Sequence, residues 1–326
     1  MSTLDGTGVL AWLRGRTGGL LSPRTEADRE RRRIAALTLP FLVLATVGAF
    51  VPLFYMFRMS VSESRFAIEG LQFDSYVTLF ESVAAAVPVV GEGIAADPVY
   101  GEVIWTSLWF GALTTVVSVA LGVAIAHGLE KYPLPRKGTL VTLISFPISL
   151  PGIVVAFMIQ IWFSQTGVLT NFFAALSGAD PIDIALTGQP PETTLAIAGL
   201  FLGYLYSMIP RAAFLLRGSY AEVNDDAEEA ARALGATPWQ TFRYVTLPQI
   251  RPGVVGALIL TFRTALAIFG TVLVLKALSV VTFRFQYEIS NGYDLPMASA
   301  LAGLFFVFTL LFTFLGLRYT SAEVSA

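Results

Sequence analysis

Side chains able to perform chemistry are scarce in this 326-residue sequence, which has no cysteine and one histidine. A disulfide, a thiolate metal site and a cysteine nucleophile are therefore excluded, and a single histidine disfavours a histidine metal site. The lysines are Lys131, Lys137 and Lys276, and none lies in the G-x-x-x-x-G-K-[ST] pattern that holds ATP phosphates. We predict a chain that is not an enzyme, with no catalytic residue, no metal and no cofactor; any ATP must be bound elsewhere.

One charged residue, Arg263, lies near the middle of a long apolar run. Placing arginine there costs at least about 2.5 kcal/mol on insertion scales, so its side chain must face protein or a wet cavity. Two interpretations stay open: Arg263 attracts an anionic part of a solute, or it bonds backbone carbonyls as a structural residue. Tyr204 and Met208, just before Pro210, are further candidates to line a solute pathway, although such side chains in membrane helices more often serve packing.

Polar residues also concentrate in the segment 224–250, between two apolar runs. Asp225 is expected to cap a first short helix that stops at Gly235, and Thr237 to cap a second that ends at Leu247-Pro248. A DNA-binding helix-turn-helix has this outline, but the acidic residues of the first helix would repel phosphates. An ordinary solvated connecting loop stays open as an alternative.

The elements around this segment are apolar enough to cross a membrane. Hydrophobic residues make up 55% of the chain and charged residues only 13%, against about 25% charged in soluble domains. A spanning helix needs roughly 20 mostly apolar residues. Six such runs are present, at Ile34–Phe57, Val103–Leu129, Leu140–Phe163, Thr194–Leu216, Gly253–Leu275 and Pro296–Leu317. The expected class is an all-α integral membrane protein with six transmembrane helices.

The basic residues predict which side each connection occupies. Arginines crowd residues 24–33 directly before the first run, and the connections after the second and fourth runs are richer in Lys and Arg than the others. Basic residues favour the cytoplasmic side, so both termini and the 224–250 segment are expected there. We therefore expect a cytoplasmic tail over residues 1–33 and a six-helix membrane domain over 34–326, in the cell (plasma or inner) membrane.

The polar segment resembles a known signature. Glu229-Ala230-Ala231 is followed at fixed spacing by Gly235 and then by Leu247-Pro248, which is similar to the EAA motif of permease subunits of type I ABC importers; Val245 stands where isoleucine is usual. The resemblance implies the six-helix permease fold, with a coupling loop at about 217–252 whose first helix docks on a cytoplasmic ATPase. The coupling residues so implied are Glu229, Ala230, Ala231, Leu234, Gly235, Leu247 and Pro248.

A second resemblance covers the fifth apolar run. The stretch FRTALAIFG, which contains Arg263, is similar to the fifth span of permeases for iron(III), sulfate, thiamine, phosphonate and polyamines, although Ile268 stands where many of them have an acidic residue. The resemblance favours a small solute of the iron, thiamine, phosphonate or polyamine group over a sugar.

The function expected from these resemblances is half of the translocation pathway of an ATP-driven importer. Implied partners are a cytoplasmic ABC ATPase dimer, a second permease subunit (identical or different), an extracytoplasmic substrate-binding protein and membrane lipid, but no nucleic acid. The alternative is a secondary transporter or channel not driven by ATP. The six runs contain no Asp or Glu, which weakens that alternative because ion-driven carriers commonly place carboxylates in their spans.

Overall fold

The computed structural model describes residues 26–87, 96–188 and 195–324, and in these ranges every regular element is a helix. The all-α class expected from the sequence is confirmed. Six helices are long and apolar enough to cross a membrane, one for each predicted run. The chain divides into two compact units, residues 1–58 and 59–326, which are described separately.

The first unit consists, in its described part, of helix α2 (Glu26–Met59), which reaches one residue into the second unit. This helix contains the predicted first span and continues through Pro40 and Pro52. Residues 1–25 of the expected cytoplasmic tail lie outside the described residues, and residues 26–33 form the first turns of α2.

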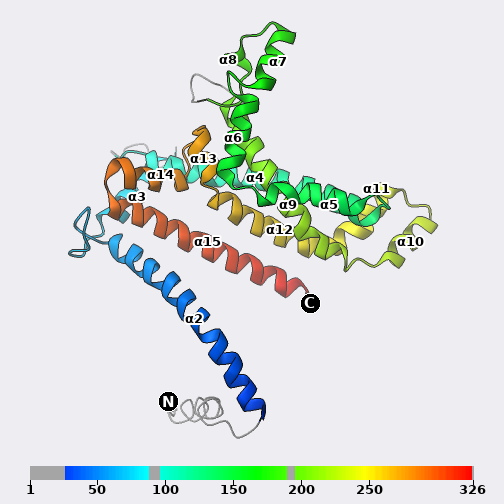
Figure 1. Cartoon of the computed structure of the whole chain (residues 1–326), viewed down its shortest axis with the longest axis horizontal. Helices are drawn as coiled ribbons and strands as arrows, with labels where there is room; N and C mark the ends of the chain where they lie inside the picture. Colours follow the sequence, from blue (N-terminus) through cyan, green and yellow to red (C-terminus); the bar gives the residue numbers. More distant parts are fainter. Residues whose placement is uncertain (1–25, 88–95, 189–194, 325–326) are drawn as a thin grey trace. The chain divides into compact units, whose positions relative to one another are not determined.

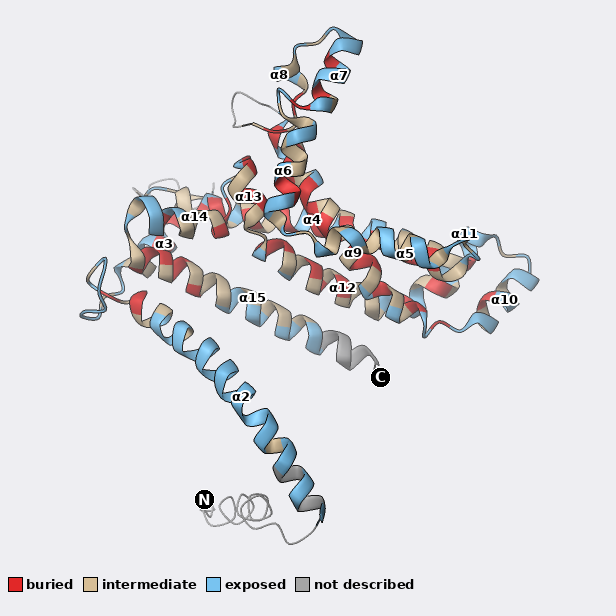
Figure 2. Ribbon diagram, in the orientation of Figure 1, coloured by how far each residue is buried: buried red, intermediate tan, exposed pale blue. Residues whose placement is uncertain are grey.

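The core of the second unit is formed by α4 (Val99–Lys131), α9 (Ala196–Tyr220) and α12 (Leu247–Ala267), which run side by side with α15 (Leu295–Val324) against α12 (Figure 1). Small residues allow the close approach that membrane helices use in place of hydrophobic collapse. At Gly122 of α4, a Cβ would lie 2.8 Å from the Cβ of Ala212 on α9. The buried residues follow these facing stripes (Figure 2).

The third and fifth predicted spans are each a broken helix. The third run comprises α5 (Lys137–Ser145), the 3-10 turn η1 (Phe146–Ser149) and α6 (Gly152–Phe163). The fifth run breaks between α12 and α13 (Gly270–Leu275). The two breaks meet: the Thr271 hydroxyl donates to the Gly152 carbonyl at 3.1 Å, and a Cβ on Gly270 would lie 2.9 Å from the Ile153 nitrogen.

Short helices occupy the connections opposite the 224–250 segment. They are α3 (Asp74–Ala85), α7 (Val168–Ser177), α8 (Pro181–Ile184), α14 (Val281–Tyr287) and the π-helical turn η3 (Glu288–Gly292). The buried Glu288 carboxylate accepts hydrogen bonds from Tyr100 at 2.9 Å and Arg284 at 2.8 Å. The ion pair joins α14 to η3, and the hydrogen bond from Tyr100 ties η3 to the start of α4.

Candidate functional site

The first polar helix, α10 (Asp225–Ala233), begins one residue earlier than its predicted cap implied. The cap is Asn224, whose side-chain oxygen accepts from the backbone N–H groups of Asp226 at 3.0 Å and Ala227 at 3.4 Å. The prediction that Asp225 caps this helix was therefore wrong. The Asp225 carboxylate instead bonds Lys131 at the end of α4, at 2.6 Å. The lysine diverts Asp225 from the backbone, and the neighbouring asparagine supplies the cap.

The end of α10 follows the predicted glycine stop. Gly235 has φ +89°, in the left-handed region that side chains rarely adopt. The N–H of Ala236 donates to the Ala231 carbonyl at 3.1 Å, and the N–H of Gly235 donates to the Arg232 carbonyl at 3.0 Å. These two bonds form the Schellman arrangement that satisfies the last helical carbonyls. The bend between the two polar helices thus depends on the glycine.

The second polar helix, α11 (Pro238–Thr241), is capped as predicted by Thr237, with Gln240 completing the capping box. Its end differs from the prediction. The chain continues through a π-helical turn, η2 (Phe242–Thr246), directly into α12, so Leu247-Pro248 begins the long helix rather than ending the short one. Proline is tolerated there because a first-turn N–H has no helical partner. The polar segment is consequently joined to the fifth span without a loop.

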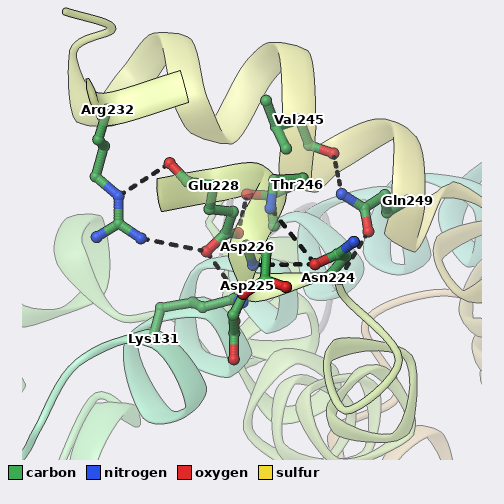
Figure 3. A network of polar contacts seen from close by, with 10 residues as sticks. Lys131, Asn224, Asp225, Asp226, Glu228, Arg232, Val245, Thr246 and Gln249 are labelled. Atoms are coloured by element: carbon green, nitrogen blue, oxygen red, sulfur yellow. Dashed lines mark hydrogen bonds and ion pairs between the residues drawn. The ribbon is translucent and has the colours of Figure 1, made fainter. Parts of the chain in front are cut away.

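A buried carboxylate, Glu228, anchors α10 to two long helices (Figure 3). One oxygen accepts from the Thr246 hydroxyl at 2.5 Å, and the other lies 3.1 Å from the Lys131 ammonium and 3.9 Å from Arg232. Thr246 directly precedes α12, and Lys131 is the last residue of α4. Any movement of α10 is therefore passed to both helices through charge-assisted hydrogen bonds.

Sequence reasoning missed this role of Glu228. A signal was present, since a cluster of acids in one polar segment and a lysine at the inner end of another span predict an ion pair. The choice of Glu228 over its neighbours depends on the direction of each side chain around α10. That direction is set by how α10 packs against its neighbouring helices, and the sequence alone does not predict this packing.

The ion pairs also set the charge state of the exposed carboxylate. The hydrogen bond and the positive charge of Lys131 hold the pKa of Asp225 below its ordinary range, since both favour the ionised form. Asp225 thus stays negative at neutral pH, so the contact with Lys131 persists there.

Further contacts connect the same region to α9 and α5. Glu130 pairs with Arg217 of α9 at 2.5 Å and with Lys137 of α5 at 2.9 Å. On the aromatic side, Phe242 packs edge-on against His127 of α4, with ring centroids 5.0 Å apart. The inner ends of four helices are held together around the polar segment.

The predicted coupling residues lie mostly on the outside of this anchored unit. Glu229, Ala230 and Pro248 are exposed, Ala231 and Leu247 are half-buried, and Leu234 is 91% exposed. Trp239 and Tyr244, which sequence reasoning passed over, are also exposed at 69% and 75%. Large apolar side chains presented on a short polar element are typical of a surface that another protein covers. The signal was available, because both aromatics lie within the same polar segment.

Of the predicted pathway residues, Arg263 and Met208 line one cavity of about 450 Å³ between α9 and α12. Arg211 of α9 and Thr261 of α12 line it as well. Tyr204 is buried in the core instead, with its ring 5.1 Å from that of Phe110. The structure therefore brings two arginines together that lie far apart in the sequence.

Metal chemistry finds no support in the described ranges, where no group of three or more His, Cys, Asp or Glu side chains gathers. The site has two charged features. Ion pairs lie at one end of the bundle, and a cavity lined by two arginines lies within it.

Residues 118–321 match the family of binding-protein-dependent transport system inner membrane components. The sulfate transport system permease protein CysW of Synechococcus elongatus is 28% identical over 213 residues, which cover 64% of this chain and 70% of that protein. The spermidine/putrescine transport system permease protein PotB of Escherichia coli is 28% identical over 174 residues, covering 53% of this chain and 60% of that protein.

Among solved structures, a bacterial ABC transporter involved in the import of the acidic polysaccharide alginate has a similar fold, with a TM-score of 0.71 and 17% sequence identity over 91% of this chain and 98% of that chain. The same comparison finds the alginate transporter in complex with its pentasaccharide-bound periplasmic protein, at a TM-score of 0.70. The six-helix importer-permease fold expected from the sequence is confirmed by this likeness.

Proposed function

Because the chain belongs to the family of binding-protein-dependent transport system inner membrane components, we propose that it forms half of the pathway of an ATP-driven importer and couples to its ATPase through α10. As a permease subunit it is a transport component rather than an enzyme, and it resides in a membrane. The second half of the pathway would be a second permease subunit, identical or different, and an extracytoplasmic binding protein would deliver the solute.

The observation that carries the coupling proposal is the burial of Glu228 between Lys131 and Thr246. It joins an exposed polar helix to α4 and α12, so a force applied to α10 reaches two spans. When two ATPase subunits close on ATP, the α10 helices of two permease subunits would approach each other. Rigid spans would then convert that movement into opening toward the outside. ATP would be bound by the partner alone, and this chain would need no cofactor.

The proposed orientation places α10 and both termini in the cytoplasm. Positive charge supports it: Lys131, Lys137, Arg217 and Arg232 all lie around α10, at one end of the bundle. Because the chain has no cysteine, Ala233→Cys introduces a single thiol on α10. A membrane-impermeant thiol reagent applied from outside should leave it unlabelled, and labelling should appear once the membrane is permeabilised. Labelling of intact cells would place α10 outside the cytoplasm and contradict the proposed orientation.

For the solute, we propose a small molecule or ion of the iron, thiamine, phosphonate or polyamine group expected from the fifth span. The names of the matched relatives, a sulfate permease and a spermidine/putrescine permease, support a small charged solute. A secondary carrier or channel is the competing function. It predicts solute uptake that continues when the ATPase carries a substitution that abolishes hydrolysis.

The test of coupling is copurification with the cognate P-loop ATPase. Glu229→Lys reverses a charge on the exposed face of α10, and Gly235→Pro removes the positive-φ bend, so both variants should lose the ATPase. The matched control is Glu222→Lys, which reverses an exposed charge just outside α10 and should retain it. Retention of the ATPase by folded Glu229→Lys and Gly235→Pro proteins would reject coupling through this helix.

A further inference from the structure

The cavity between α9 and α12 contains two positive charges that no ion pair balances. Arg211 and Arg263 both line this space of about 450 Å³. In the described part of the chain neither guanidinium has a hydrogen-bond or ion-pair partner, and none of the residues lining the cavity is acidic. Arg211 is half-buried and Arg263 is exposed, and like charges that line one cavity repel each other, so an anion between them is favoured.

A buried hydroxyl in the same cavity also has no partner. Thr261 is 3% exposed, and its Oγ1 forms no hydrogen bond in the described structure. Its neighbour Thr264 lines the cavity as well but donates to the Leu260 carbonyl at 2.8 Å, as helix threonines commonly do. Buried hydroxyls are normally bonded, so the Thr261 hydroxyl is a donor that this conformation leaves unused.

The position of the cavity suits a solute pathway. The apolar sequence continues on both sides of Arg263, from Gly253 to Phe262 and from Ala265 to Leu275, which places the arginine within the membrane. Ile148, in the 3-10 break of the third span, lines the cavity too. Irregular backbone at membrane depth occurs where it is buried in protein or lines a water-filled cavity, and broken helices form the solute sites of many transporters.

We infer that this cavity binds a small divalent oxyanion, such as a phosphonate or sulfate, through Arg211, Arg263 and Thr261, which narrows the proposed solute to an anionic one. The inference rests on the proposed function, because it makes the cavity part of the solute pathway. Guanidinium groups form charge-assisted, often paired hydrogen bonds with oxyanions, and the hydroxyl adds a third donor. Polyamine cations are disfavoured, since they would meet two positive charges and no carboxylate. The competing occupant is a carboxylate of the second permease subunit.

The test measures binding of radiolabelled inorganic sulfate to the full-length chain purified in nanodiscs with its ATPase, with radiolabelled spermidine as the cationic probe. Arg263→Gln removes one charge, Arg263→Lys keeps it, and Thr261→Val removes the hydroxyl at nearly constant volume. The matched control is Arg251→Gln, which removes the same charge from α12 outside the cavity.

Sulfate should bind the wild-type complex, and Arg263→Gln should bind it about 10- to 100-fold more weakly, as expected for the loss of one hydrogen-bonded charge. Arg263→Lys should recover part of the affinity, Thr261→Val should lose less than Arg263→Gln, and Arg251→Gln should match the wild type. Absent sulfate binding, tighter binding of spermidine, or equal affinity of Arg263→Gln and wild type would each overturn the inference.

A measurement of subunit assembly distinguishes oxyanion binding from the competing possibility, in which a carboxylate of the second permease subunit occupies the cavity. If Arg263→Gln, but not Arg251→Gln, dissociates the two permease subunits in light scattering, the arginine serves a subunit contact and the inference is overturned. Copurification of the ATPase is scored in the same samples. A wild-type complex that retains the ATPase but binds no sulfate rejects the oxyanion site alone, whereas a wild-type chain that never retains the ATPase rejects the proposed function.

Discussion

Charged side chains are paired at the end of the bundle around α10, but they are not paired in the cavity between α9 and α12. Around α10, each of Lys131, Asp225 and Glu228 has a partner of opposite sign within 3.1 Å. In the cavity, Arg211 and Arg263 line the same space, and neither has such a partner among the residues that the structure describes. Paired charges hold elements in a defined geometry, whereas unpaired charges inside a membrane are costly and are retained where function needs them. The contrast distinguishes the proposed coupling region from the proposed solute site.

The largest effect is expected when a buried charge in the α10 network loses its partner. Lys131→Met should destabilise the protein by about 3 kcal/mol, because the buried Glu228 would lose its cation. The measurement is thermal unfolding in detergent. The double variant Lys131→Met/Glu228→Gln should recover most of the loss, since the neutral amide still accepts from Thr246. A single variant as stable as the wild type would show that the ion pair does not anchor α10.

The second largest effect is expected at the bend. Gly235→Ala should cost about 1–2 kcal/mol, because φ +89° places a Cβ in a disfavoured conformation. Gly256→Ala is the matched control: it lies inside α12 at ordinary φ, and no atom lies within 4 Å of the added Cβ. That control should be neutral or stabilising, because alanine favours helix over glycine. Equal effects at the two positions would mean that the bend tolerates side chains.

These two sites show which parts of the structure the sequence could predict. The Gly235 stop and the Thr237 capping box were predictable, because each depends on residues within a few positions along the chain. The burial of Glu228 was not, since its partner Lys131 comes from another span and their contact depends on how α10 is seated. The acidic cluster predicted a partner but not which acid would be buried.

The membrane-spanning helices also have features that the sequence predicted and features that it did not. Six apolar runs predicted six spans because length and composition suffice for that inference. The break at Ile268 has no proline to signal it, and a continuous apolar run was therefore predicted. The backbone deviates there because the third and fifth spans cross closely at Gly152 and Gly270. The meeting of Arg211 with Arg263 likewise follows from the packing of α9 on α12.

A third, smaller effect tests the cavity side of the contrast. Arg263→Met should change the free energy of unfolding by no more than about 0.5 kcal/mol toward destabilisation, because no partner of opposite charge is lost. Thermal unfolding in detergent, compared with Lys131→Met, checks this. A loss comparable to that of Lys131→Met would show that Arg263 is held by a structural contact, and the two regions would no longer differ in kind.

The smallest effect concerns pH at the exposed member of the α10 network. The pKa of Asp225 is lowered by Lys131, so its contribution to stability is fully present above the ordinary aspartate pKa of about 3.9 and is lost as pH falls through the lowered value. Asp225→Asn should therefore melt slightly below the wild type near neutral pH, and the difference should vanish in strong acid. The effect is small because Asp225 is exposed and Glu228 still pairs with Lys131. A difference that persists unchanged in strong acid would assign the effect to something other than this ion pair.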